Sequence, residues 1–242
     1  MKDNCIISGR DKSMNYSDVQ QVAKNTMSYL EYKIKQGMTV KQIVKMAEDY
    51  MLYSGILSFW YYGIGAFVFP GEDTVLSISG RDYIPSDRVI AKNDIVTIDL
   101  SPQSQNIWGD YSRTLIIEDG IVVKNHDYIS NQEFRDGLII EKTLHSKLFD
   151  LVSPDMTFEE LYFFMNDQIK YLGYNNLDFL GNLGHSIETE KNNRIYIEKG
   201  NKTRLSAALM FTFEPHIRKS GSKFGFKMES IYYFKDGSLI EL

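Results

Sequence analysis

Two segments of the chain place apolar residues at helical spacing behind the same dipeptide. Residues 38–55 read MTVKQIVKMAEDYMLYSG and residues 156–173 read MTFEELYFFMNDQIKYLG. A threonine at a helix start can cap the free N–H groups of the first turn, and a glycine readily ends a helix. The pattern therefore predicts helices that begin after Thr39 and Thr157 and stop at the closing glycines.

The pattern of elements around these segments also repeats. Helical sequence precedes each of them, at residues 17–37 and 131–151, and strand-rich sequence follows. The segments recur at an offset of 118 residues, and the strand-like runs that hold Asp99 and Glu214 recur at 115. We therefore expect an α+β domain made of two related halves, each with outer helices and a strand in a central sheet.

Four carboxylates and one imidazole interrupt apolar runs that otherwise read as strands. A carboxylate in such a run points into the interior, where an unpaired charge costs several kcal/mol. Several converging there would repel one another unless cations held them together. Carboxylates with one imidazole suit manganese, cobalt, iron or zinc. The five residues, in NDIVTIDLS, WGDYSRTLII, GNLGHSIE, LMFTFEPHI and FKMESIYYF, are Asp99, Asp110, His185, Glu214 and Glu229.

Each of these residues also has a purely structural explanation. Asp99 could cap a strand end, Glu229 could pair with Lys227, and His185 could be a satisfied polar residue in a turn after Gly184. The set of five favours a metal centre over five separate structural roles.

Composition limits the class of protein. At 242 residues with 43% hydrophobic content and no linker-like stretch, we expect one domain over residues 16–242 behind an N-terminal extension, residues 1–15. A net charge of −5 with mixed Lys and Arg argues against a nucleic-acid partner.

The N-terminal sequence and the cysteine content indicate a compartment. The polar start MKDNCIISGRDKSM resembles neither a signal peptide nor an anchor, and no apolar run approaches membrane-spanning length. Cys5 is the only cysteine, which excludes an internal disulfide and a thiol nucleophile near the motifs. We expect a cytoplasmic protein with no membrane partner.

In their order, residue types and flanking sequences, the five residues resemble those of the pita-bread metallopeptidases, the group of methionine aminopeptidase, aminopeptidase P and prolidase. The matching segments are VTIDLS, GDYSRT, GHSI, FTFEP and KMES, and the likeness runs from about residue 16 to the C-terminus. The resemblance implies a pseudo-two-fold α+β fold around a curved antiparallel sheet.

The resemblance also assigns roles to the five residues. It implies two divalent ions, with manganese favoured: Asp99 and Asp110 bind one, and His185 and Glu214 bind the other. Asp110 and Glu229 bridge the two. Glu214 and His185 are the implied catalytic residues, and Glu214 would take a proton from the attacking water and pass it to the leaving amine. The implied reaction is removal of an N-terminal residue from a peptide.

The sequence of the motifs favours the proline-specific branch of the group. IPSDRVIAKNDIVTIDLS and GDYSRT look more like prolidase and aminopeptidase P, whereas the short length is closer to methionine aminopeptidase. We expect a hydrolase of Xaa-Pro-type peptides that could form a homodimer. The alternatives are a methionine aminopeptidase, a non-peptidase hydrolase and a binding module.

Two positions depart from the family pattern. Asp82 and Asn192 stand where these enzymes usually have histidines that bind substrate or stabilise the tetrahedral intermediate. We expect Asp82 at the rim of the cleft, His216 in the cleft if Pro215 does not break strand alternation, and Trp60 in the pocket wall. Two further pocket candidates are Tyr61 and Tyr62.

Overall fold

The computed structural model describes residues 13–242. Cys5 and most of the expected extension, residues 1–12, lie outside the described residues. In this described part of the chain, four α-helices belong to the two halves: α1 (Tyr16–Lys33), α2 (Val40–Tyr53), α3 (Gln132–Leu151) and α4 (Phe158–Tyr171). Short 3₁₀ turns are η1 (Gly71–Val75), η2 (His126–Tyr128), η3 (Lys191–Asn193) and η4 (Leu205–Ala207).

The repeated Met-Thr segments form matching helices, as the sequence predicted. Thr39 and Thr157 are the N-caps of α2 and α4, each in a capping box, with φ and ψ of −86° and 157° in one and −87° and 157° in the other. Both helices are 14 residues long. Each threonine also forms an isolated antiparallel bridge, to Val89 and to Arg204. These paired features agree with a duplicated domain.

The first predicted helix is shorter than expected. α1 ends at Lys33 because Ile34 is already extended, with ψ of 132°, whereas the pattern suggested a helix up to Gly37.

All strand pairs within residues 13–242 are antiparallel. In the N-terminal half the sheets have the orders β2-β3-β6-β7 and β1-β4-β5. Their strands are β1 (Ser58–Phe59), β2 (Ala66–Pro70), β3 (Asp94–Leu100), β4 (Pro102–Ser104), β5 (Ile107–Trp108), β6 (Tyr111–Glu118) and β7 (Ile121–Val122).

In the C-terminal half the orders are β11-β10-β8 and β13-β12-β9. The strands are β8 (Tyr174–Asn176), β9 (Phe211–Phe213), β10 (His216–Lys219), β11 (Gly225–Lys227), β12 (Ser230–Lys235) and β13 (Ser238–Glu241). A bridge between Ser112 and Glu229 joins the two halves.

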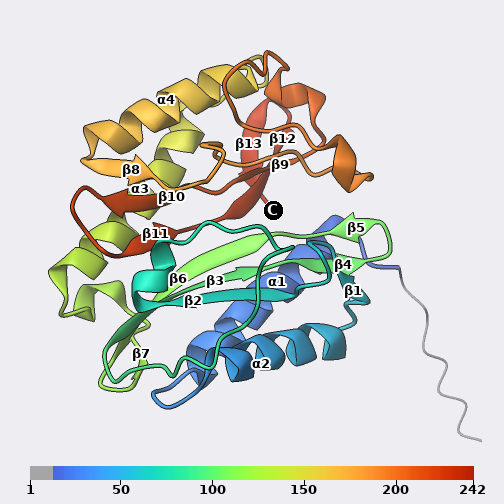
Figure 1. The fold of residues 1–242 in the computed structure, drawn as a ribbon. Helices are drawn as coiled ribbons and strands as arrows, with labels where there is room; N and C mark the ends of the chain where they lie inside the picture. The colour runs from blue at the N-terminus through green and yellow to red at the C-terminus, as the bar shows by residue number, and fades with distance from the viewer. Residues whose placement is uncertain (1–12) are drawn as a thin grey trace, which may run out of the picture.

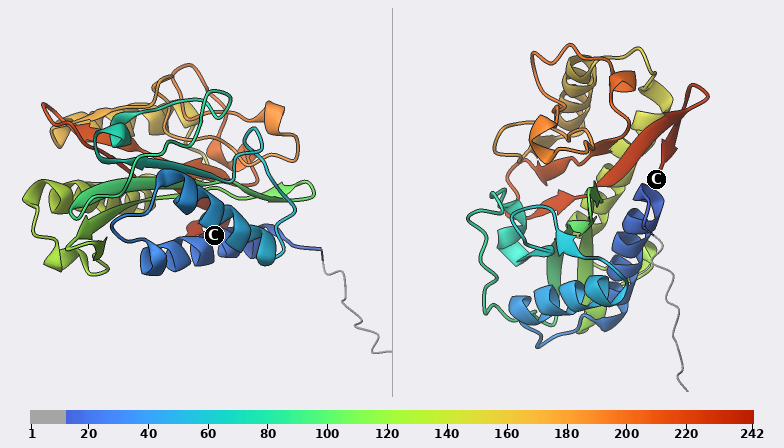
Figure 2. Two further views of the ribbon diagram at one scale, coloured as in Figure 1. Left: turned by 60° about the horizontal axis from the view of Figure 1, so that its bottom comes forward. Right: turned by 90° about the vertical axis from the view of Figure 1, so that its right-hand side faces the viewer.

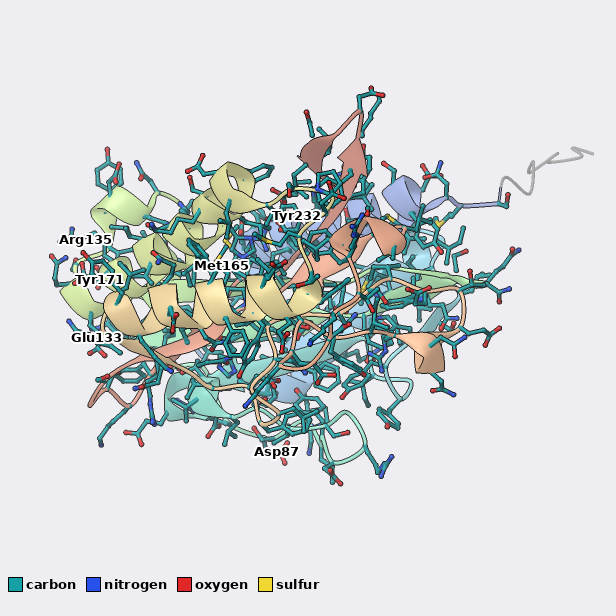
Figure 3. All side chains as sticks on the ribbon, turned by 90° about the horizontal axis from the view of Figure 1, so that it is seen from above. Asp87, Glu133, Arg135, Met165, Tyr171 and Tyr232 are labelled. Atoms are coloured by element: carbon teal, nitrogen blue, oxygen red, sulfur yellow. The ribbon has the colours of Figure 1, made fainter. Side chains whose placement is uncertain are left out.

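The helices cover the outside of the strands. Figure 1 shows α2 below β2 and β3, α1 running diagonally behind these strands, and α4 above β8 and β10. The right-hand view in Figure 2 also places α2 and α4 at opposite ends of the molecule. Each half has its own apolar core, one around α2 and β3 and the other around α4 and β9. Met165 and Tyr232, labelled in Figure 3, are fully buried in the second core. The strands therefore meet between the helical layers, as a pita-bread fold requires.

No helix within residues 13–242 combines the length and the apolar character needed to cross a membrane.

Candidate metal centre

The pleat of β3 decides where Asp99 points. Successive side chains on a strand face opposite sides. Val96 and Ile98 belong to the core beneath α1 and α2, whereas Thr97 and Asp99 line a cavity on the other face. The apolar run NDIVTIDLS therefore stabilises the N-terminal half and directs one carboxylate toward the C-terminal half.

Asp110 lies just before β6 and is held by a buried glutamine of α1. The Gln20 amide donates to the Asp110 carbonyl at 2.7 Å, and the Asp110 N–H donates to the Gln20 side-chain oxygen at 3.1 Å. These two bonds satisfy the backbone of Asp110 and leave its side chain free to face the cavity.

His185 is positioned through its backbone and one ring nitrogen. Its N–H donates to Thr212 Oγ1 at 3.0 Å, and Nδ1 lies 3.0 Å from the Ser186 carbonyl, to which it must donate. Nε2 is then free as a ligand and lies 3.5 Å from Asp110 Oδ2 and 3.8 Å from Glu214 Oε1. The ring that the GHSI segment carries thus faces two carboxylates.

Gly184 makes this approach possible. Its φ of +139° suits glycine, and a Cβ at this position would lie 2.3 Å from the Thr212 carbonyl oxygen. Any other residue would push the His185 segment away from β9.

Glu229 is the residue whose surroundings best fit a bound cation. The residue is 1% exposed, and neither carboxylate oxygen has a hydrogen-bond partner within residues 13–242. Its ligand atom and those of Asp110 and His185 all lie within 4.8 Å of one another. A buried carboxylate without a hydrogen-bond partner is costly, so these three donors fit one divalent ion well.

Lys227 lies among the remaining carboxylates. Its Nζ is 2.6 Å from Asp99 Oδ2, 2.9 Å from Glu214 Oε2 and 3.5 Å from Glu229 Oε2. Burial alone lowers the pKa of this lysine, but the three carboxylates outweigh burial and hold its pKa well above the ordinary value. The ammonium group is therefore a fixed positive charge in the centre.

Burial and the neighbouring charges act differently on the four carboxylates. At Asp99 burial outweighs Lys227, and the pKa is raised although the lysine lies 2.6 Å away. Burial raises the pKa of Asp110 to about 7, although the neighbouring His185 acts in the opposite direction. Burial also raises the pKa of Glu229 well above its usual range. For Glu214, burial is outweighed by Lys227 and His185, and its pKa is lowered. Glu214 is therefore a carboxylate at neutral pH.

Four of the five predicted ligands, all but Glu229, line a cavity of about 170 Å³ with several aromatic side chains in its wall. Trp60 donates from Nε1 to the Gly109 carbonyl at 3.0 Å and packs edge-on against His185. The Arg194 guanidinium lies 4.7 Å from the centroid of the Trp60 ring. Tyr61 also lines the cavity, but Tyr62 is exposed and outside it.

His216 lines the cavity as the sequence suggested. Its Nε2 lies 2.7 Å from the Thr74 carbonyl, which can only accept, so Nε2 carries the hydrogen. Burial lowers its pKa to about 4. The ring is therefore neutral at pH 7, with Nδ1 as an acceptor.

The two positions that depart from the family pattern both lie outside the cavity lining. Asp82 is exposed in the segment before Tyr83, and Asn192 is exposed in η3. A substrate role for Asp82 stays a prediction. The cavity instead contains Arg194 and Tyr196, which the sequence did not single out.

Comparisons with known proteins place the chain among metal-dependent peptidases. The model of metallopeptidase family M24 matches residues 15–236. A curated relative, the Xaa-Pro dipeptidase of Pyrococcus furiosus, is 23% identical over 221 residues, which are 90% of this chain and 57% of that protein. The Xaa-Pro dipeptidase of Pyrococcus horikoshii is 26% identical over 176 residues, 70% of this chain and 46% of that one. The chain thus spans about half the length of these relatives.

Solved structures share the fold. The X-Pro aminopeptidase of Thermotoga maritima has a TM-score of 0.77 at 20% identity and matches 93% of this chain and 59% of its own. The prolidase of Pyrococcus furiosus has a TM-score of 0.75 at 21% identity, over 93% of this chain and 61% of its own. The methionine aminopeptidase of Thermotoga maritima has a TM-score of 0.71 at 13% identity, over 95% of this chain and 98% of its own.

These structural likenesses confirm the predicted pita-bread architecture. With the family model matching nearly the whole chain, the protein belongs to metallopeptidase family M24.

Proposed function

We propose that this protein is a metal-dependent exopeptidase that hydrolyses the N-terminal peptide bond of Xaa-Pro-type peptides. The observation that carries the proposal is the meeting of Asp110, His185 and Glu229 close to Glu214, beside a cavity with aromatic side chains in its wall. The Xaa-Pro dipeptidases among the relatives support the choice of substrate.

Asp110, His185 and Glu229 would hold the ion, for which we favour manganese. A divalent ion held there lowers the pKa of a bound water and polarises a carbonyl group. Two ions are the number expected from the family resemblance, but the position of Lys227 bears on that number, as described below.

Glu214 is the proposed proton carrier. Its lowered pKa keeps it ionised, and Oε1 lies 3.8 Å from His185 Nε2, so the carboxylate faces the reaction centre. It can accept the proton of the attacking water and return it to the leaving amine. For an Xaa-Pro bond this amine is the ring nitrogen of proline.

His216 and the cavity wall would position the peptide. The bare Nδ1 of His216 can accept a hydrogen bond from a substrate N–H, but in this tautomer it cannot donate to an oxyanion. Trp60 and Tyr61 offer flat apolar surfaces that suit a proline ring. The small cavity and its acidic end favour a short peptide with a free amino terminus.

A panel of matched peptides tests the substrate class. We expect the manganese-loaded protein to cleave Ala-Pro and Phe-Pro dipeptides faster than Ala-Ala and Phe-Ala, and to leave N-acetylated versions intact. Equal rates on the Pro and Ala members of each pair would contradict the proline preference, and cleavage of the acetylated peptides would contradict the exopeptidase class.

A methionine aminopeptidase is the second candidate. The relevant observation is that this chain covers 98% of the Thermotoga maritima methionine aminopeptidase but only 46–61% of the proline-specific relatives cited above. Faster release of methionine from Met-Ala-Ser than of alanine from Ala-Pro would favour this second function.

A further inference from the structure

We propose that the ammonium group of Lys227 takes the place of one of the two metal ions, so that the centre binds a single divalent ion through Asp110, His185 and Glu229. The inference deepens the proposed metal site, but it does not depend on the choice of peptide substrate.

The first step is the division of the five predicted ligands. Asp99 and Glu214 both lie within hydrogen-bond distance of Lys227 Nζ, at 2.6 and 2.9 Å. Asp110 makes no ion pair with this lysine among the described residues, and Glu229 lies farther away at 3.5 Å. Asp99 and Glu214 therefore already share a cation at hydrogen-bond distance. Among the other three donors, only Glu229 contacts this lysine, and it does so at the longer distance.

The second step is that Lys227 is fixed in this position. Its backbone N–H donates to Thr114 Oγ1 at 2.8 Å, and Thr114 Oγ1 donates to its carbonyl at 3.2 Å. The neighbouring Phe226 is fully buried in the C-terminal core. The stem of the lysine thus starts from an anchored strand, and its side chain is only 15% exposed.

The third step is electrostatic. An ion ligated by Asp99 would lie next to an ammonium group that is already 2.6 Å from the same carboxylate. Like charges at such separations in a buried site repel strongly. Binding of a second ion would require Lys227 to break its three ion pairs and leave the cavity. Binding of one ion by Asp110, His185 and Glu229 leaves the pairs of Lys227 with Asp99 and Glu214 intact.

Manganese binding measured without peptide tests the inference. We expect the chelator-stripped protein to bind one Mn²⁺ per chain in equilibrium dialysis, with the electron paramagnetic resonance spectrum of an isolated ion. Lys227→Met, which keeps much of the stem and removes the charge, should bind two and show a spin-coupled pair. Lys223→Met, at an exposed lysine that pairs with Glu72, is the matched control and should still bind one.

A second pair of variants keeps the inference testable if Lys227→Met does not fold. Asp99→Asn should leave the Mn²⁺ dissociation constant within about twofold, because Asp99 is not a ligand in this arrangement. Asp110→Asn should weaken binding by more than about tenfold. Two bound ions in the parent, one ion in folded Lys227→Met, or equal losses in the two Asp variants would overturn the inference. A parent that binds one ion but cleaves no peptide would instead contradict only the proposed function.

Discussion

Replacement of Gly137 by alanine tests how tightly α3 and β11 hold the centre in place. A Cβ at Gly137 would lie 2.3 to 2.4 Å from three ring atoms of Phe226. Real Cβ contacts essentially never fall below 3.0 Å, so the ring or the strand must move by roughly 1 Å. Phe226 is fully buried and directly precedes Lys227.

Two opposing effects set the size of the change. Alanine in place of glycine stabilises a helix by about 1 kcal/mol, whereas overpacking of a core costs about 1–3 kcal/mol. Because a rigid aromatic ring meets the new methyl group, we place the cost at the upper end. Gly137→Ala should then lower the free energy of unfolding by about 2 kcal/mol, and the melting temperature by about 4–8 °C for a chain of this size.

Urea unfolding followed by tryptophan fluorescence measures this change. Ser146→Ala, at an exposed position of the same helix, is the control and should stay within about 0.5 kcal/mol of the parent. In the double variant Gly137→Ala/Phe226→Leu, the smaller side chain should recover about 1 kcal/mol relative to the sum of the single changes. A Gly137→Ala protein as stable as the parent would refute the packing argument.

Three further predictions concern pH, catalysis and the exposed aspartate. Burial lowers the pKa of His145 in the folded protein to about 3, whereas in the unfolded chain the pKa has its ordinary value of 6.5. As the pH falls, the unfolded chain takes up this proton first, so the folded state loses stability between pH 6.5 and 3. Between pH 6.5 and pH 5, one and a half pH units at about 1.4 kcal/mol each give about 2 kcal/mol. The difference in free energy of unfolding between the parent and His145→Gln should therefore narrow by about 2 kcal/mol from pH 7 to pH 5. A constant difference would rule out a neutral buried histidine. Glu214→Gln cannot accept a proton, and its turnover of Ala-Pro should fall by about 10²–10⁴, so a turnover within threefold of the parent would exclude it as the proton carrier. Asp82→His should change the turnover or the KM for Xaa-Pro peptides if this residue meets the substrate, and kinetics identical to the parent's would make it a loop residue only.

Local sequence signals predicted the parts of the fold that depend on neighbouring residues. Thr39 and Thr157 cap their helices through residues three positions later, and the alternation in β3 is visible in DIVTIDL. Three of the five polar residues in apolar runs, Asp110, His185 and Glu229, lie within ligand distance of one another. Asp99 and Glu214 lie beside them and both contact Lys227.

The parts that sequence reasoning missed depend on contacts between distant segments. Lys227 was considered only as a partner of Glu229, two residues away. Its pairs with Asp99 and Glu214 arise because β11 lies beside β6, through Thr114, and that register is not encoded in the KMES segment. Arg194 was missed because it reaches the cavity through a contact between distant segments. Tyr196, two residues after Arg194, forms a β-bridge with His185 and so brings the Arg194 side chain to Trp60.

The most direct test of the central claim is proline release by the protein stripped of metal and then reloaded. Ala-Pro is incubated with the protein after chelation, and free proline is followed by mass spectrometry as Mn²⁺ is added stepwise. We predict no release after chelation and full recovery on adding Mn²⁺, with Asp110→Asn requiring at least about tenfold more ion for half-recovery. Release that survives chelation, or no release at any Mn²⁺ concentration, would contradict a metal-dependent Xaa-Pro peptidase.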